Sequence, residues 1–234
     1  LMIVASSMFA TILFSQQESK RAKVLLTLMT VITLGATVMT AMRASFVGLI
    51  AFFLMISLHP RYGRQVWRLS LIPLLAIAVT VFLYEPMRSK LFITASFISR
   101  LYLWRHALAL WGDHVLFGIG LNHFQYTFPR HFIHDGGFAY FDAHSLYLQV
   151  ASQQGLFGLL SLLVILGGYL YYWRKIKGTT SLGEVVKYAS LGGFCVTFVS
   201  GIFDTTLHHE HAIAFTTLTG LLLAHSGRWT ERKQ

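Results

Sequence analysis

Long uncharged apolar runs alternate along the chain with short polar segments that carry most of the charge. Crossing a bilayer as a helix takes about 20 mostly apolar residues, because no backbone N–H or C=O group can stay unpaired in lipid. Shorter runs reach this length by including flanking residues. The pattern predicts an all-α fold, a polytopic transmembrane helical bundle with about seven spans. The runs are 1–15, 24–42, 44–58, 69–84, 146–173, 188–203 and 212–224.

Composition excludes a soluble globular domain. The 234 residues are 55% hydrophobic and 12% charged, whereas soluble domains carry about 25% charged residues. The first run has neither the basic segment nor the small-residue cleavage site of a signal peptide. We expect it to be the remainder of a span, which would make the chain the C-terminal part of a longer protein. A single cysteine, Cys195, permits no disulfide framework.

The basic residues predict how the spans are oriented. Segments 16–23, 59–68, 174–187 and 225–234 hold 13 of the 19 Lys and Arg residues against three acidic ones. The alternate segments hold six of each, so the whole net charge of +10 falls on one face. Positive segments mark the cytoplasmic side, so the excess base reflects topology and indicates no nucleic-acid partner. The other face, the periplasm in a bacterium, receives nine of the eleven histidines.

The longest polar interruption divides the chain into three parts. We predict four transmembrane helices in 1–84, a periplasmic catalytic loop in 85–145, and three more transmembrane helices with a cytoplasmic tail in 146–234. Within the loop, apolar and basic residues at helical spacing predict a helix over 91–111. Glycine and proline make 117–141 irregular. Because membrane helices need no such loop for their own packing, we expect it to carry the chemistry.

Three arginines on the outer face are candidate anion ligands. Arg43 stands alone between two apolar runs, where it either anchors a helix end or binds an anion; the sequence favours neither. Arg100 and Arg105 flank Trp104 on the predicted loop helix. They either lie among lipid phosphates or direct one guanidinium inward, where it would bind a substrate phosphate with two hydrogen bonds. Composition alone favours the lipid interpretation.

A glycine-rich stretch, GIGLN at 118–122, follows this helix. It lacks the third glycine and the βαβ surroundings of a dinucleotide-binding loop. We expect a tight turn that places Asn122.

His144 lies where the predicted loop becomes a span. An imidazole titrates near neutral pH, which suits a general base acting at the bilayer surface. We expect nearby arginines to favour its neutral form. The alternative is a polar residue that caps the helix or bonds Asp142.

The motif DTTLHHEH at 204–211 could hold a metal ion. On a helix, Asp204, His208 and His211 would share a face, and imidazole with carboxylate suits zinc. No second cluster at a recognisable spacing completes a closed site. A solvated loop or the wall of a cavity is therefore the favoured interpretation.

Three motifs together resemble the O-antigen ligase family, within the O-antigen ligase/polymerase superfamily of bacterial envelope enzymes. The first is an arginine just after an outer helix end, TAMRAS around Arg43. The second is R-x-x-x-W followed by G-x-G-x-N-x-F, which appears as RLYLW (100–104) and GIGLNHF (118–124). The third is His144-Ser145, then nine residues, then GLFG at 155–158.

This resemblance implies a glycan transfer from an undecaprenyl-diphosphate carrier to the lipid A–core oligosaccharide of lipopolysaccharide. Arg43 and Arg100 would bind the diphosphate, and His144 would be the general base. Supporting roles would fall to Arg105, Asn122 and Asp142. The reaction would be inverting, with no metal ion or cofactor. The enzyme would be a multi-pass protein of the bacterial inner membrane, with membrane lipids around it and its active site on the periplasmic face.

The alternatives differ in acceptor or in class. Ser145 and Leu159 replace the Asn and Thr that such motifs often carry, which leaves open a polymerase or a protein O-oligosaccharyltransferase of the same superfamily. A transporter of a lipid-linked anion would need charges midway through its spans, and the seven runs contain none. A metal-dependent hydrolase or sensor built on 204–211 is the last alternative, and it predicts inhibition by a chelator.

Overall fold

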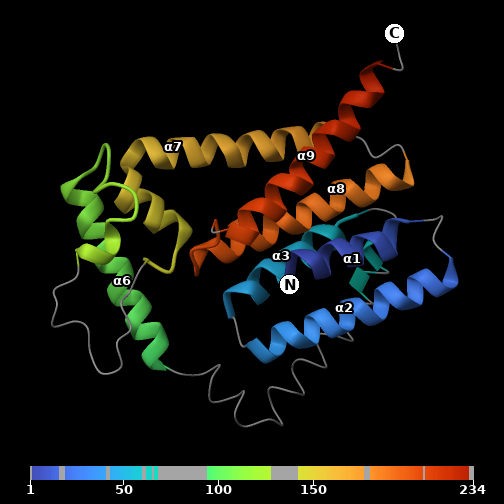
Figure 1. Cartoon of the computed structure of the whole chain (residues 1–234), viewed down its shortest axis with the longest axis horizontal. Helices are drawn as coiled ribbons and strands as arrows, with labels where there is room; N and C mark the ends of the chain where they lie inside the picture. Colours follow the sequence, from blue (N-terminus) through green and yellow to red (C-terminus); the bar gives the residue numbers. More distant parts are fainter. Residues whose placement is uncertain are drawn as a thin grey trace. The chain divides into compact units, whose positions relative to one another are not determined.

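The computed structural model describes residues 2–15, 19–40, 43–59, 62–64, 66–67, 94–127, 142–176, 180–207 and 209–231. Every regular element within these ranges is helical, so the all-α prediction is confirmed for this part of the chain (Figure 1). The elements are α1 (Met2–Phe14), α2 (Lys20–Thr40), α3 (Arg43–Ser57), α6 (Thr94–Asp113), η1 (Phe124–Tyr126), α7 (Leu146–Lys175), α8 (Ser181–Phe194), η3 (Cys195–Val199), η4 (Ser200–Ile202) and α9 (His209–Glu231).

Two helical stretches among the described residues are long and apolar enough to cross a membrane. They are Leu146–Lys175 and Ser181–Ile202, while Met2–Phe14 and Phe46–Ser57 are apolar but shorter. Six of the seven predicted spans fall on helices, and the seventh, 69–84, lies outside the described residues. The full set of seven spans stays a prediction.

α7 is bent, although the sequence predicts one uninterrupted span there. Gly155 has φ 65° and ψ −154°, which no helix contains. A Cβ at this position would lie 2.4 Å from the carbonyl oxygen of Leu116, so only glycine fits. The 20 residues from Leu156 to Lys175 then run about 30 Å at 1.5 Å per residue, which matches the hydrocarbon core. The straight part of α7 that is long enough to cross a membrane therefore starts at the bend.

The chain divides into two compact units. The first comprises 1–92, 172–200 and 208–234. In it α1 packs on α2 and α8, and α3 packs on the π-helical turn η3. Gly48 permits the close approach of α3, because a Cβ there would lie 2.4 Å from Ser200 Oγ and 2.8 Å from Val196 Cα. This unit is a bundle of apolar helices.

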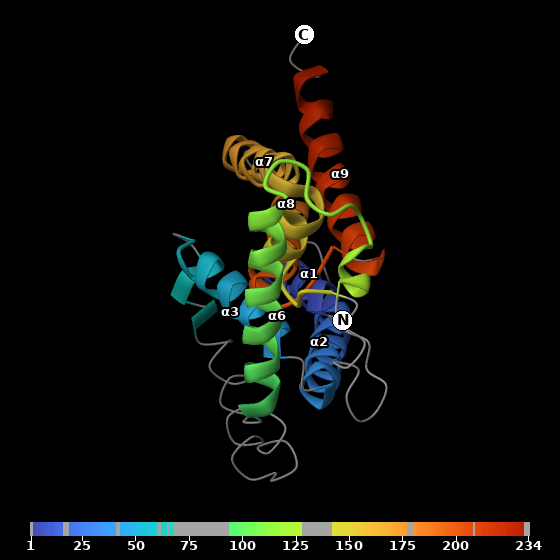
Figure 2. The ribbon, with the colours of Figure 1, turned by 90° about the vertical axis from the view of Figure 1, so that its left-hand side faces the viewer.

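The second unit comprises 93–171 and 201–207. It contains α6, the turns that follow it and α7 up to Tyr171, which Figure 2 shows from the α6 side. Its core is formed by Leu103, Ala107, Phe124 and Ala143. The predicted helix over 91–111 corresponds to α6. The described part of the predicted loop thus packs with α7 and with a distant segment.

Candidate functional site

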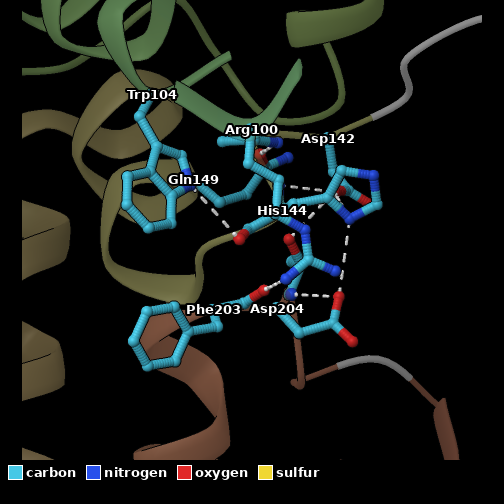
Figure 3. Close-up of polar contacts among 9 residues, drawn as sticks. Arg100, Trp104, Asp142, His144, Gln149, Phe203 and Asp204 are labelled. Carbon is cyan, nitrogen blue, oxygen red and sulfur yellow. Dashed lines mark hydrogen bonds and ion pairs between the residues drawn. The ribbon is translucent and has the colours of Figure 1, made fainter. Parts of the chain in front are cut away.

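His144 occupies a strained backbone position two residues before α7. Its φ of 45° lies in the left-handed region, which costs a residue with a Cβ roughly 1–2 kcal/mol. The backbone N–H donates to Asp142 Oδ1 at 2.8 Å, and the carbonyl accepts from Trp104 Nε1 at 3.4 Å. The neighbouring N–H of Ala143 donates to Gln149 Oε1 at 2.7 Å. Contacts from α6 and α7 therefore hold this conformation in place (Figure 3).

The imidazole of His144 lies beside two carboxylates. Its Nδ1 atom is 3.5 Å from Asp142 Oδ1 and 3.5 Å from Asp204 Oδ1. These separations exceed the 2.7–2.9 Å of a close charge-assisted bond, and the buried Nδ1 has no closer hydrogen-bond partner among the described residues. The side chain as a whole is 39% exposed, and Figure 3 shows Nε2 directed away from Asp204. One ring nitrogen thus faces anions while the ring remains open to solvent.

The carboxylates raise the pKa of His144. The Asp204 side chain beside Nδ1 has the largest effect, burial of the ring opposes it, and the negative charges of Asp142 and Asp204 add to the increase. The positive charge of Arg100 lowers the pKa, but less than the carboxylates raise it. Arg100 thus favours the neutral form, as expected of a nearby arginine, but the two carboxylates outweigh it and the net pKa is raised.

Asp204 reaches His144 from a segment 60 positions later in the chain. Its carbonyl accepts from the N–H of Leu146 at 3.0 Å, which fixes the segment 201–207 on the start of α7. Its Oδ1 accepts from the N–H of Thr205 at 3.0 Å, and Thr205 Oγ1 donates to Asp142 Oδ1 at 3.1 Å. Burial would raise the pKa of Asp204, but His144, the Thr205 N–H and Arg100 together lower it.

The helical face on which the metal alternative would place Asp204, His208 and His211 does not include Asp204. α9 begins only at His209, and Asp204 lies in the non-helical stretch before it, bonded to the start of α7. His208 lies outside the described residues. Across the ranges that the structure describes, no group of three or more His, Cys, Asp or Glu side chains could hold a metal ion.

The structure brings Arg100 to this cluster. Its Nη1 donates to the carbonyl of Phe203 at 2.9 Å, next to Asp204 (Figure 3). Trp104 lies one helical turn further along α6, and its ring centroid is 6.1 Å from that of Phe203. Positions four apart share a helix face whereas positions five apart do not, so Arg105 lies on another side of α6, where it is exposed.

Arg43 is the first residue of α3, at the helix start that the sequence predicts. Its side chain lies outside the described part. Because α3 belongs to the first unit and His144 to the second, the pairing of Arg43 with the cluster stays a prediction.

Asn122 lies in the predicted tight turn and has φ 61°. Its backbone N–H donates to Gln153 Oε1 at 3.1 Å. The same turn donates from the N–H of Ile119 to the Ser152 carbonyl and from the N–H of Gly120 to the Gln153 carbonyl, each at 2.9 Å. In these contacts Asn122 serves the docking of the turn on α7 rather than the ring of His144.

Two glycine motifs that are separate in sequence meet at this point. A Cβ on Gly118 would lie 2.3 Å from the carbonyl carbon of Gln153, and one on Gly155 would lie 2.4 Å from the Leu116 oxygen. Both glycines have positive φ, 67° and 65°. In the sequence the two motifs are independent marks of a family, whereas in the structure their backbones pack directly on each other.

The sequence analysis missed three contributions to the cluster. Gln149 follows His144 by five residues and Trp104 belongs to the R-x-x-x-W motif, so each had a local signal without a stated role. Asp204 was assigned to a solvated loop or the wall of a cavity, with metal binding as the alternative. Its partnership with His144 spans 60 residues, and no local pattern predicts such a contact.

A known family model covers the part of the chain that holds these residues. Residues 24–163 match the O-antigen ligase family, a range that covers more than half of the chain and includes Arg43, Arg100, His144 and both glycine motifs. No curated protein matches the chain. Proteins of this family are membrane proteins and glycosyltransferase-like enzymes of the O-antigen ligase/polymerase group. With the motifs inside the matched range, the chain belongs to the O-antigen ligase family.

Proposed function

We propose that this chain belongs to an inner-membrane glycosyltransferase that moves an O-antigen glycan from undecaprenyl diphosphate to the lipid A–core oligosaccharide. The observation that carries the proposal is the His144 ring, which has Nδ1 beside Asp142 and Asp204 and remains 39% exposed. In this proposal, residues 85–145 form a periplasmic catalytic loop between the membrane helices of 1–84 and those of 146–234.

The proposed reaction is a single inverting displacement. The acceptor hydroxyl oxygen forms a bond to C1 of the donor sugar while the bond from C1 to the diphosphate oxygen breaks. The leaving diphosphate takes the electron pair, and the hydroxyl proton goes to Nε2 of neutral His144. The other ring proton stays on Nδ1 and faces Asp142 and Asp204, whose charges stabilise the imidazolium that forms. A positioned base of this kind typically contributes about 10²–10⁴-fold in rate.

The arginines would stabilise the charge that develops on the diphosphate. We assign this role to Arg43 and Arg100, with Arg105 in support, because a well-placed donor is typically worth about 3 kcal/mol in the transition state. A guanidinium has five N–H donors, and the bond from Arg100 Nη1 to Phe203 uses one of them. That bond fixes the group and leaves other donors for a phosphate. No metal ion or cofactor enters this scheme.

A second candidate is a polymerase or a protein O-oligosaccharyltransferase of the same superfamily. The same residues would act in the same way, and only the acceptor would differ. Ser145 and Leu159 keep this alternative open.

The decisive experiment is transfer in vitro by the full-length protein, without added metal, from an undecaprenyl-diphosphate-linked donor. Lipid A–core and carrier-linked glycan are offered separately to wild type, His144→Ala and His123→Ala. His123 is the matched control, an exposed histidine of the same unit whose ring contacts only the Leu121 carbonyl and Tyr126 in the described contacts.

Transfer to lipid A–core that only His144→Ala abolishes supports the ligase proposal. Extension of the carrier-linked glycan would make the enzyme a polymerase with the same base. Full activity of His144→Ala would contradict the mechanism, and loss of activity on chelation would favour the metal-dependent alternative.

A further inference from the structure

The turn between α6 and η1 exposes large apolar side chains although it is held firmly in place. Val115, Leu116 and Phe117 are 47%, 52% and 72% exposed. Four backbone hydrogen bonds fix this turn on the bend of α7, two of them from the N–H groups of Leu156 and Phe157 to the carbonyls of Val115 and Leu116. A turn that is fixed by its backbone keeps these side chains outward for a reason other than its own folding.

The exposed residues continue directly onto the spanning part of α7. The ring of Phe117 stacks on that of Phe157, with centroids 5.2 Å apart and planes 28° apart. Phe157 is 56% exposed, and Leu160 on the next turn of the helix is 49% exposed. We name the six side chains of this continuous surface the turn patch: Val115, Leu116, Phe117, Leu156, Phe157 and Leu160.

The length of α7 sets the level of the turn patch in the membrane. The straight helix from Leu156 to Lys175 is about 30 Å long, which is the thickness of the hydrocarbon core. Arg174 and Lys175 at one end suit the headgroups. Leu156 and Phe157 therefore lie at the opposite hydrocarbon boundary, and the stacking places Phe117 at the same level. Figures 1 and 2 both show the turn after α6 against the bend of α7.

We infer that the turn patch inserts into the outer leaflet and contacts lipid acyl chains just below the headgroups. Residues 115–121 carry no charge, so burying them removes apolar surface from water without desolvating an ion. The polar residues before the turn, Asp113 and His114, are exposed and remain in water. The inserted turn fixes the bend of α7 to the membrane surface, and His144 precedes that bend by 11 residues. This inference requires a membrane protein and does not depend on the proposed reaction.

Depth-dependent fluorescence quenching tests the insertion. The full-length protein, with Cys195→Ala and any other native cysteine replaced, carries one bimane-labelled cysteine in vesicles of phosphatidylethanolamine and phosphatidylglycerol. Phe117→Cys reports on the turn patch. Val164→Cys, 73% exposed in the middle of the span, is the deep reference, and Asp113→Cys is the aqueous one. The quenchers are a nitroxide near the lipid headgroup, a nitroxide deep in the acyl chain, and iodide in the buffer.

The expected result is that the shallow nitroxide quenches the label at 117 most strongly, the deep nitroxide quenches that at 164, and iodide quenches that at 113. Quenching of the label at 117 by iodide with none by lipid nitroxides would place the turn in water and overturn the inference. Absence of quenching by all three would also overturn it, because another segment or a second copy would then cover the turn patch. The double variant Phe117→Ser, Leu116→Ser, tested for folding by gel filtration, separates insertion from a packing role. If these side chains contact lipid and not protein, the variant should fold as wild type does.

Discussion

The two ends of the first straight segment of α7, residues 146–154, are fixed by opposite means. At the His144 end, side chains hold a strained backbone in place, through contacts from Asp142, Trp104 and Gln149. At the Gly155 end, the absence of side chains allows two backbones to bond directly. Because several separate contacts hold the first end, we expect it to tolerate loss of any one of them. The second end has no space for an added side chain. The comparison separates residues that perform chemistry from residues that position it.

The largest expected effect is at the glycine contact. Gly155→Ala would place a methyl group 2.4 Å from the Leu116 oxygen at φ 65°. We therefore expect the free energy of unfolding to fall by more than the roughly 1–3 kcal/mol that such a backbone conformation costs. Gly118→Ala should behave similarly. Gly168→Ala is the control, because nothing lies within 4 Å of a Cβ there. Thermal unfolding followed by fluorescence-detected gel filtration measures the change. Equal melting temperatures for all three variants would show that the contact is not rigid.

At the His144 end, substitutions should affect transfer and stability differently. His144→Ala and His144→Gly both remove the proposed base and should abolish transfer. Glycine relieves the strain at φ 45°, so His144→Gly should be more stable than His144→Ala by about 1 kcal/mol. Thermal unfolding and the transfer assay on the same preparations test both expectations. Equal stability of the two variants would mean that the left-handed conformation is not kept without the imidazole.

The pH dependence of transfer should report the two carboxylates. The proposed base must be neutral, so the rate should rise as pH passes upward through the raised His144 pKa. Asp204→Asn removes the largest contribution to that increase, so the half-maximal point should move to lower pH, and the maximal rate should fall because the imidazolium is less stabilised. Asp142→Asn should shift it less, because the charge of Asp142 raises the His144 pKa less than the Asp204 side chain does. The introduced asparagine also keeps an acceptor for the backbone N–H of His144.

Asp113→Asn, at an exposed acid at the end of α6, is the control for this profile and should shift nothing. The raised pKa of His144 also makes the stability of the fold depend on pH. A raised His144 pKa means that the interaction of the protonated ring stabilises the fold at low pH, and this stabilisation is lost as pH rises through the folded-state pKa. A shift to higher pH in Asp204→Asn would contradict the assignment.

The two arginines of α6, Arg100 and Arg105, should differ in their effect on transfer. Arg100→Ala should abolish transfer, because its guanidinium lies with the His144 cluster. Arg105→Ala should reduce it far less. Kinetics with increasing donor would separate weaker diphosphate binding, seen in KM, from lost stabilisation of the leaving group, seen in kcat. An inactive Arg105→Ala beside a normal Arg100→Ala would mean that the wrong arginine was chosen.

The sequence predicted the helices well and the contacts between distant segments poorly. Apolar runs determine where α1, α7 and α9 lie, because burial or lipid contact follows directly from local composition. The bend at Gly155 was missed because a glycine inside an apolar run has no local sign of the Leu116 backbone that it must accommodate. The contact of Asp204 with His144 was missed because the two residues lie 60 positions apart and no local pattern connects them.

The smallest expected effect distinguishes the two roles open to Asn122. If it only forms the turn, its φ of 61° is what matters. Asn122→Gly should then leave stability and transfer nearly unchanged, while Asn122→Ala loses about 1 kcal/mol of stability. The backbone N–H that bonds Gln153 is present in both variants. If the Asn122 side chain instead supports catalysis, both variants lose transfer equally and their stabilities do not explain the loss. The contacts of this turn favour the first outcome, which would assign Asn122 to the glycine end of the segment rather than to the His144 end.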